Sequence, residues 1–424
     1  MISRKSLVAI TVLVTAVVVT LALNWSLSEK RIDRRVPTLY GVADPRFTRS
    51  MGAMLGPDLL PGNQVTALIN GDEIFPAMLA AIRGARTSIN FESYIYWSGE
   101  IGRTFADALA GRARAGIPCH VLIDWVGSEK ISAALIEEME KAGVHITRYN
   151  PPHWYKLARL NNRTHRKILV VDGKVAFTGG VGIADLWNGH AQDRDHWRDS
   201  HFQVEGPAVA QMQSAFEDNW AEATGEVLHG DAYFPALTPA GNQRAQMFIS
   251  SPGGGSESMQ LMYLLSIAAA LHEIRLSASY FVPDHVTTDA LLAALRRGVR
   301  LRIIVPGPVT DSDLVRGASK ARWGPLLAAG AEIYEYQPTM FHCKVMIVDD
   351  LWTSVGSTNF DNRSFAINDE ANLNVYDHDF AVAQSRVFEA DLKQARRVTY
   401  EQWRERPLKE RIMEVLSAPV GEQL

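Results

Sequence analysis

The sequence predicts an α/β fold made of two duplicated lobes, each a mixed sheet flanked by helices, packed as a pseudo-dimer behind one N-terminal transmembrane helix. Three observations predict it. The chain has 424 residues, more than one hydrophobic core usually serves. Helical and strand-like apolar patterns alternate along it, and the same order of elements occurs twice. Its 47% of apolar and 21% of charged residues are typical of a folded globular protein.

The N-terminal segment is apolar and carries no charge from Leu7 to Leu23, and basic residues lie on both sides of it. With its flanks it reaches the length of a helix that spans a bilayer. A cleaved signal peptide, with Thr20-Leu21-Ala22 as cleavage site, is the alternative. We favour an uncleaved anchor in residues 1–36. Its orientation stays open, because basic residues flank both ends.

The first lobe is predicted over residues 37–230. A helical apolar pattern that stops at a glycine and leads into a strand occurs three times, at 76–96, 108–124 and 138–151. The lobe then closes with the strand "DSHFQVEG" and a long helix. Alternation of helix and strand predicts a sheet covered by helices on both faces.

The second lobe, residues 257–424 with a C-terminal helical tail, repeats this order. A helix leads into a strand at 262–282, 290–307 and 325–338, with a glycine between them in the last two, and "EANLNVYD" precedes another long helix. Between the lobes, residues 231–256 end in "SSPGGGS" and are predicted to be a linker.

One loop distinguishes the lobes. The first carries a surplus, "PPHWYKLARLNN", which includes Trp154, Tyr155, Lys156 and Arg159. Two interpretations stay open: a loop that rests on a lipid interface, and an ordinary surface loop with one buried tryptophan.

The pattern H-x-K-x4-D occurs at equivalent places in both lobes, formed by His165, Lys167 and Asp172 and by His342, Lys344 and Asp349. Residues i and i+2 of a strand face the same side, so each histidine and its lysine project together. If the lobes face each other, two imidazoles and two ammonium groups converge. One neutral imidazole can attack phosphorus while the other protonates the leaving oxygen, and the lysines neutralise phosphate oxygens. The predicted substrate is therefore a phosphodiester.

Other site classes find less support in the sequence. A net charge of −4 and a pI of about 6.3 weigh against a dedicated nucleic-acid binder. Cys119 and Cys343 lack the spacing of a zinc site or a disulfide framework. No ligand pattern links the histidines 153, 190, 196 and 201. We expect no metal requirement and no cofactor.

The duplicated motif and its surroundings resemble the phospholipase D superfamily, and within it the bacterial cardiolipin synthase branch. "NRTHRKILVVDGKVAFTGG", "HWRDSHFQVEGPAV" and "FHCKVMIVDDLWTSVGSTNFDNRSFAINDEANL" carry the resemblance, which extends from about Asn70 to the C-terminal tail. It implies one globular unit of two α/β halves with the site at their interface, and a covalent phosphohistidine intermediate. It also implies that His165 is the nucleophile and His342 the general acid.

The resemblance assigns supporting roles residue by residue. Glu370 is expected to accept a hydrogen bond from His342, and Asp199 from His165. Ser357 and Asn359 match residues that touch phosphate. The first half has Gly180-Val181-Gly182 where many relatives have asparagine, which puts a symmetric asparagine role in doubt. The motif aspartates Asp172 and Asp349 lie at the far end of each strand, where we interpret them as structural turn residues.

The function that the resemblance implies is a membrane-anchored phosphatidyltransferase at the bacterial inner membrane, which acts on anionic phospholipids such as phosphatidylglycerol. Hydrolysis to phosphatidic acid by the same site is the first alternative, because the choice depends on how well the site excludes water. A nuclease of the same superfamily is the second, although the acidic composition and the expected anchor argue against a nucleic-acid partner.

Overall fold

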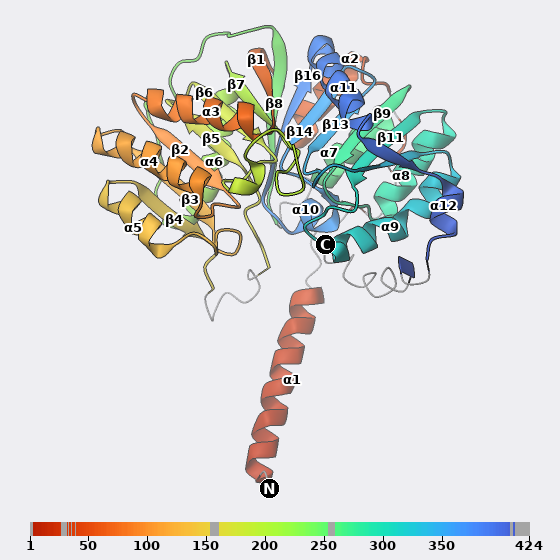
Figure 1. Ribbon diagram of the computed structural model, residues 1–424, viewed down its shortest axis with the longest axis horizontal. Helices are drawn as coiled ribbons and strands as arrows, with labels where there is room; N and C mark the ends of the chain where they lie inside the picture. The colour runs from red at the N-terminus through yellow and green to blue at the C-terminus, as the bar shows by residue number, and fades with distance from the viewer. Residues whose placement is uncertain are drawn as a thin grey trace.

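The computed structural model describes residues 3–26, 40–152, 161–252 and 259–407, with short stretches at 32, 34, 36–38 and 410–411. Figure 1 shows two halves side by side, the first in orange to yellow-green and the second in green to blue, with α1 (Arg4–Ser26) in red below them. The loop residues Trp154, Tyr155, Lys156 and Arg159 lie outside the described residues, so both interpretations of that loop stay predictions.

Among the described residues of the first half there are seven strands, four α-helices and one 3-10 turn. Their order is β1 (Leu60–Ile69), α3 (Asn70–Gly84), β2 (Ile89–Ser93), α4 (Glu100–Arg114), β3 (Cys119–Asp124), α5 (Ala133–Lys141), β4 (His145–Tyr149), β5 (Ile168–Val171), β6 (Val175–Gly179), η2 (Asp185–Trp187), β7 (Ser200–Glu205) and α6 (Ala208–Thr224).

The second half repeats this order with a few additions. Its elements are β8 (Gln243–Ser250), α7 (Met259–Ala269), β9 (Glu273–Ala278), β10 (Phe281–Val282), α8 (His285–Arg296), β11 (Arg300–Pro306), α9 (Asp313–Ala328), β12 (Glu332–Tyr336), β13 (Lys344–Val348), β14 (Trp352–Gly356), β15 (Phe360–Asp361), α10 (Asn362–Ala366), β16 (Glu370–Tyr376), α11 (His378–Leu392), β17 (Ala395–Val398) and α12 (Tyr400–Arg404).

The strands of both halves join into one continuous sheet of 15 strands, in the order β17-β12-β11-β9-β13-β14-β16-β8-β1-β7-β6-β5-β2-β3-β4. Read outward from the central β8–β1 pair, the two sides have equivalent strands, with β17 as an addition at one edge. The predicted mixed sheets are present. The sequence did not predict their fusion, in which Leu60 of β1 pairs with Ala245 of β8.

Each half is mixed for the same reason. Helical crossovers make β2, β3 and β4 parallel, as they do β9, β11 and β12. The other neighbours are antiparallel, and short turns join two of these pairs, β5–β6 and β13–β14. Side-chain caps begin several of the helices: Ser132 caps α5, Asp284 caps α8, Ser312 caps α9 and Asp377 caps α11.

Helices cover both faces of the sheet, as predicted. Along β3, Val121 and Ile123 pack into a core with α3, α4 and α5, while Leu122 between them packs into another core with α6. This second core contains side chains of both halves, such as Ile168 and Ile347, together with residues of α6 and α11. The halves therefore share an apolar interior and do not merely touch.

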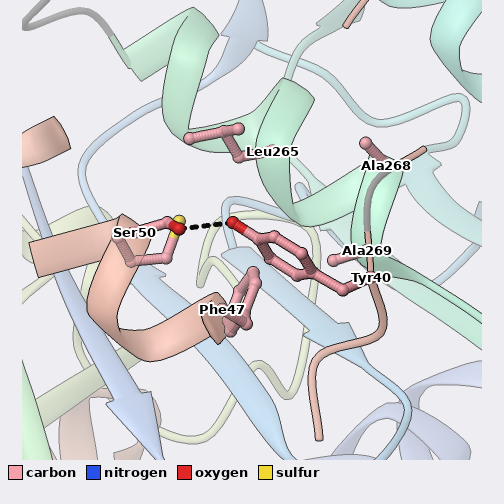
Figure 2. Close-up of a pocket in the computed structure, with 7 residues that line it drawn as sticks. Tyr40, Phe47, Ser50, Leu265, Ala268 and Ala269 are labelled. Atoms are coloured by element: carbon pink, nitrogen blue, oxygen red, sulfur yellow. Dashed lines mark hydrogen bonds between the residues drawn. The ribbon is translucent and has the colours of Figure 1, made fainter. Parts of the chain in front are cut away.

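The ends of the predicted domains differ from the structure in two places. Helix α2 (Pro45–Leu55) places Phe47, Met51 and Leu55 in the core of the second half, not of the first. Figure 2 shows Tyr40 and Phe47 against α7, where they enclose a small apolar cavity of about 10 Å³ and Tyr40 donates a hydrogen bond to Ser50. The predicted linker 231–256 contains β8, a central strand.

Helix α1 forms where the sequence predicted a helix. Its described apolar side chains are exposed, among them Val12, Leu13, Val14 and Val18. Within the described residues, no helix satisfies the combined length and hydropathy required of a membrane span. The transmembrane assignment of residues 1–36 therefore remains a prediction.

Candidate active site

The two motifs lie on extended segments that lead into equivalent strands, β5 and β13. Each segment pairs with the other half. The amide of His165 donates to the carbonyl of Asp369 at 2.8 Å, and the amide of His342 donates to the carbonyl of Arg198, also at 2.8 Å. The first bond places His165 next to Glu370, which follows Asp369. The second places His342 next to Asp199, which follows Arg198. The backbone therefore crosses the two halves at the site.

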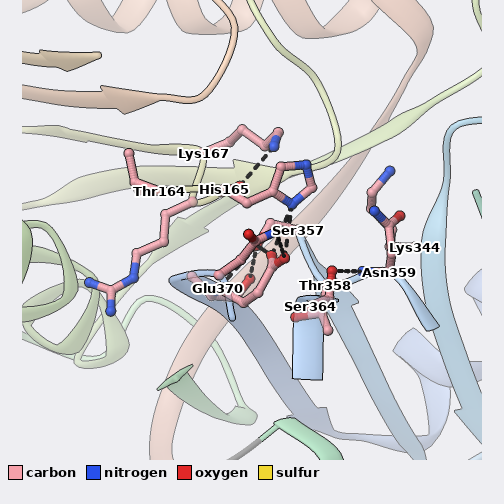
Figure 3. A network of polar contacts seen from close by, with 12 residues as sticks. Thr164, His165, Lys167, Lys344, Ser357, Thr358, Asn359, Ser364 and Glu370 are labelled. Atoms are coloured by element: carbon pink, nitrogen blue, oxygen red, sulfur yellow. Dashed lines mark hydrogen bonds and ion pairs between the residues drawn. The ribbon is translucent and has the colours of Figure 1, made fainter. Parts of the chain in front are cut away.

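His165 is bound by Glu370 of the second half. Its Nδ1 lies 3.0 Å from both carboxylate oxygens, and Figure 3 shows the ring directed at this carboxylate. The prediction that Glu370 accepts from His342 is therefore wrong. The residues of this pair are 205 positions apart, and only the crossing of the halves joins them.

His342 is bound by Asp199 of the first half. Its Nδ1 lies 2.7 Å from Asp199 Oδ2, so the predicted pairing of Asp199 with His165 is also wrong. Glu370 begins β16 and Asp199 directly precedes β7. Each of these strands is separated from the motif strand of its own half by one strand, yet each carboxylate contacts the histidine of the other half. A carboxylate at Nδ1 fixes the tautomer and leaves Nε2 of each ring for chemistry.

The two carboxylates accept hydrogen bonds from different groups. Ser357 donates its hydroxyl to Glu370 at 2.5 Å. Gly180 occupies the equivalent place in the first half, where a Cβ atom would lie 2.3 Å from Asp199 Oδ1. Asp199 instead accepts from Trp187 Nε1 at 3.0 Å and from the amide of Ser200 at 2.8 Å. The hydroxyl of Ser357 thus orients Glu370, a role that the sequence did not predict.

The motif lysines hold equivalent positions beside their histidines. Lys167 Nζ donates to the carbonyl of His165 and Lys344 Nζ to that of His342, both at 2.7 Å. Lys344 Nζ also lies 3.1 Å from Nδ1 and 3.2 Å from Nε2 of His342. Nearly equal distances to both ring nitrogens place the ammonium over the ring face. Each lysine keeps donors that a phosphate can use.

Burial and charge set the protonation states of the first motif. All six groups of the two triads, His165, Lys167, Glu370, His342, Lys344 and Asp199, are buried. Burial lowers the pKa of His165 to about 4, although Glu370 opposes this shift. Burial likewise lowers the pKa of Lys167 to about 7. Burial raises the pKa of Glu370, but its interactions with His165, Lys167 and Ser357 outweigh burial and lower that pKa to about 2. His165 is therefore neutral at neutral pH.

The second motif shifts in the same directions. Burial and the charge of Lys344 lower the pKa of His342, while Asp199 raises it. Burial lowers the pKa of Lys344. The pKa of Asp199 is lowered, because His342 and Lys344 outweigh its burial. Lys344 also acts on His165 and on Lys167, so the two motifs share one electrostatic environment. The structure thus brings the four motif side chains together.

The motif aspartates lie away from these groups. Asp172 adopts a positive φ of 56° and accepts from the amides of Arg86, Thr87 and Ser88. Asp349, with φ of 52°, accepts from the amides of residues 271, 272 and 273 in the same way. Asp172 therefore holds the end of β5 to the turn between α3 and β2, and Asp349 holds the end of β13 to the turn between α7 and β9. These contacts agree with the structural interpretation and argue against a catalytic one.

Aromatic side chains contact both catalytic histidines, and the sequence analysis did not predict these contacts. The rings of Tyr94 and His165 lie 5.1 Å apart, and Trp187 and Trp197 each lie 5.4 Å from His342. The only signal for Tyr94 was its position at the end of a strand. Asn359 is buried beside Lys344 in Figure 3, and its Oδ1 has no hydrogen-bond partner among the described residues. Only the amide nitrogen of this side chain can donate to a phosphate oxygen, so the phosphate contact of Asn359 stays a prediction.

The remaining histidines do not assemble a metal site. His190 pairs with Asp72 and His196 with Asp193 at the surface, and His153 lies outside the described residues. Across the described parts of the chain, no group of three or more histidine, cysteine, aspartate or glutamate side chains is arranged to hold a metal ion.

Comparisons with known proteins identify the family. The family model described as "Cardiolipin synthase, PLD-like domain" matches residues 78–220 and 263–392, one segment in each half. Cardiolipin synthase A of Pseudomonas fluorescens is 33% identical over 385 residues, which cover 90% of this chain and 79% of the relative. Cardiolipin synthase of Geobacillus kaustophilus is 36% identical over 358 residues, which cover 84% and 71%.

A solved structure shares the fold. The phosphatidylserine synthase of Haemophilus influenzae superposes with a TM-score of 0.64 at 14% identity, over 89% of this chain and all of that one. Because the family model matches both halves and the relatives match most of the chain's length, this protein belongs to the cardiolipin synthase family of phospholipase D-like phosphatidyltransferases.

Proposed function

We propose that this phosphatidyltransferase moves a phosphatidyl group from phosphatidylglycerol onto the glycerol hydroxyl of a second anionic phospholipid, through a phosphohistidine at His165. One observation carries the proposal: two histidine–lysine pairs, one from each half, share one buried site in which each histidine is oriented by a carboxylate of the other half. The names of the relatives support the choice of lipid.

The first step forms a bond between His165 Nε2 and the phosphorus of the donor lipid. The bond from phosphorus to the headgroup glycerol oxygen breaks, and the protonated His342 gives its proton to that oxygen. Lys167 and Lys344 offset the negative charge of the non-bridging phosphate oxygens. This electrostatic interaction is strongest in the transition state. Glu370 accepts the Nδ1 proton of His165 in a hydrogen bond and stabilises the positive charge of the ring as it forms.

The second step reverses these roles with a new alcohol. Neutral His342 takes the proton of the acceptor hydroxyl, whose oxygen attacks phosphorus while the bond to His165 Nε2 breaks. Free His165 and protonated His342 are thereby restored. In the free enzyme, burial and the charge of Lys344 lower the pKa of His342. A bound phosphate anion offsets that charge and favours the protonated form that the first step needs.

The choice of His165 as nucleophile rests on its surroundings. Its pKa of about 4 keeps the ring neutral, and both oxygens of Glu370 lie at hydrogen-bond distance from Nδ1. His342 has Lys344 over its face and a carboxylate held by Trp187. Peptide mapping of the phosphate after quenched incubation with lipid labelled in its phosphatidyl group tests the assignment. Label on the peptide with His342, and none on that with His165, would reject it.

The lipid substrate is tested with the purified full chain and phosphatidylglycerol in mixed micelles. We expect cardiolipin as the product on thin-layer chromatography. Phosphatidic acid as the sole product would mean that water, not a lipid hydroxyl, accepts the phosphatidyl group. A His165→Ala variant, which should form neither product, controls for contaminating activity.

The membrane location forms part of the proposal. Helix α1 exposes Val12, Leu13, Val14, Val17 and Val18 to solvent. A helix that is apolar on all sides requires an apolar environment, so we assign α1 as the anchor at the bacterial inner membrane. Fractionation of cells that express the full chain, or a chain without residues 1–36, tests this. Equal recovery of both in the membrane fraction would contradict it.

A further inference from the structure

Arg163 is a cation close to the catalytic residues that has no role in the mechanism above. Arg163 lies two residues before His165, on the same extended segment that continues to Lys167. Side chains alternate along such a segment, so Arg163, His165 and Lys167 belong to one side of it. Exposure decreases along this row: Arg163 is half-buried, while His165 and Lys167 are 8% and 3% exposed. The row leads from the rim to the catalytic centre.

The intervening residues confirm the alternation. The Thr164 hydroxyl binds Glu92, and the Arg166 guanidinium donates to the carbonyl of Ala215 at 2.8 Å and to Asp218 at 2.9 Å. Both contacts lie on the α6 side, away from the carboxylate of Glu370. The side chains of Thr164 and Arg166 therefore point into the protein interior. By the same alternation, the side chain of Arg163 lies on the side of the segment that carries His165 and Lys167.

A second cation reaches the same place from the other half. Arg363, in α10, donates to the side-chain oxygen of Asn161 at 2.8 Å and to its carbonyl at 3.2 Å. Asn161 is only two residues before Arg163. The backbone is also joined here, since the amide of Asp369 donates to the carbonyl of Arg163 at 2.9 Å. The two arginines therefore meet across the junction of the halves.

Their charges act on each other and on the site. Burial lowers the pKa of Arg363, the charge of the buried Asp361 opposes this shift, and the charge of Arg163 adds to it. Both arginines also act on Tyr94, whose ring contacts His165. Arg363 forms no ion pair with any residue that the structure describes, because its acceptors on Asn161 are uncharged. Two half-buried guanidinium groups in this arrangement favour an anion between them.

This arrangement of cations is one-sided. In the second half, the residue two positions before the motif histidine is Met340, which is fully buried. On that side Tyr280 donates to Asp311 at 2.5 Å, and the charge of Asp311 acts on His342 and Lys344. The two arginines therefore lie beside the His165 segment, whereas a carboxylate, that of Asp311, acts on His342 and Lys344. This difference in charge favours a second anion on the His165 side.

We propose that Arg163 and Arg363 form a second anion subsite, which binds the phosphodiester of the acceptor lipid while its glycerol hydroxyl attacks the phosphorus held at His165. This inference rests on the proposed function. The glycerol bridge of the product separates its two phosphates by three carbon atoms. An acceptor phosphate must therefore lie close to the reacting phosphorus but outside the lysine pair, which is where the arginines lie.

The subsite gives the enzyme a preference for an anionic lipid acceptor over an uncharged alcohol. The test supplies two acceptors to one donor, phosphatidylglycerol labelled in its phosphatidyl group. A second phosphatidylglycerol yields cardiolipin, and 1,3-propanediol yields phosphatidylpropanediol. Both products require the same donor and the same chemical step. Only the first acceptor carries a phosphate, so the ratio of kcat/KM for the two acceptors reports on the subsite.

We expect Arg363→Gln and Arg163→Gln each to lower that ratio about tenfold or more, the loss of one hydrogen bond between charged groups. The KM for the lipid acceptor should rise more than kcat falls. Arg363→Lys, which keeps the charge, should retain more of the ratio than Arg363→Gln. Arg114→Gln, at the end of the outer helix α4, is the matched control and should leave the ratio unchanged.

Two outcomes overturn the inference, and they are distinguishable. If the wild-type protein makes cardiolipin and the arginine variants lower both products equally, the subsite is rejected and the proposed function stands. If the wild-type protein makes phosphatidylpropanediol but no cardiolipin, both are rejected. Formation of phosphatidylpropanediol by each variant, together with an unchanged Tm, excludes misfolding as the cause of a lower ratio.

Discussion

At the scale of single residues, the crossed pairs decide how each histidine titrates. Glu370 raises the pKa of His165 against burial, and Asp199 raises that of His342. His165 must be neutral to attack, so activity should be lost as pH falls through its pKa of about 4. His342 must be protonated to donate, so activity should be lost as pH rises through its pKa, which lies below the ordinary value of 6.5.

This crossing predicts which limb of the pH profile each carboxylate controls. Glu370→Gln removes a group that raises the pKa of His165, so the acid limb of kcat/KM should move to lower pH. Asp199→Asn should instead move the basic limb to lower pH. Both variants should also lose rate, because the tautomer is less firmly held. Residual turnover of labelled lipid from pH 3.5 to 8 is the measurement; exchanged effects of the two variants would contradict the crossed pairing.

The lysines should contribute through charge in the transition state. Lys167→Ala or Lys344→Ala is expected to lower kcat by about 10²- to 10³-fold, the cost of removing one preorganised donor to developing charge. Arginine at either position should recover part of the loss. Near-normal kcat in either alanine variant would show that the ammonium groups do not act on the phosphate.

At the scale of elements, the motif aspartates hold turns and not substrate. Asp349 accepts from three consecutive amides at the start of β9 while its own φ is 52°. The residue thus combines the role of a cap with a left-handed backbone conformation that asparagine and aspartate tolerate. The same arrangement at Asp172 shows that each half uses it to attach a motif strand to its neighbour.

Asp349→Ala should therefore reduce stability more than catalysis. Loss of the shared acceptor and the strain of alanine at positive φ should together lower the free energy of unfolding by about 2–3 kcal/mol. Asp349→Asn, which suits that φ and keeps an acceptor, should cost less. Urea unfolding of both variants measures this, and kcat of the folded protein is the companion readout. A large loss of kcat at unchanged stability would favour a catalytic role.

At the scale of the whole molecule, buried charges lock the halves together. The Arg198 guanidinium, from the first half, donates to both carboxylate oxygens of Asp391 in α11, at 2.8 and 2.7 Å. Arg198 also precedes Asp199 and pairs through its backbone with the segment of His342. Arg198 thus connects the segment of the catalytic carboxylate Asp199 to the opposite half. Separation of the halves would leave the Arg198 guanidinium without its counter-charge and would separate the catalytic residues.

Asp391→Asn should destabilise the protein by about 3–5 kcal/mol, because it leaves Arg198 buried without its counter-charge. Asp218→Asn, which removes the half-exposed partner of Arg166, is the control and should cost less. Denaturant unfolding followed by tryptophan fluorescence compares the two. Equal losses would mean that the Arg198–Asp391 pair does not lock the interface.

The sequence alone determined the parts of this protein that depend on short-range pattern. Apolar periods and glycine stops are local, so the alternation of helix and strand, the duplication and the pairing of each histidine with its lysine could all be read from it. The turn role of Asp172 and Asp349 followed from their position at a strand end. Family resemblance named the two carboxylates, Glu370 and Asp199, but assigned each of them to the wrong histidine.

Only the tertiary structure decided how the two halves meet. In it, β1 and β8 join the two sheets, and α2 packs in the core of the second half. Glu370 pairs with His165, and Asp199 pairs with His342. These partners are 205 and 143 positions apart along the chain. No local spacing constrains such a pair, because the strands that bring its members together are ordered by packing of the whole sheet and not by their order in the sequence.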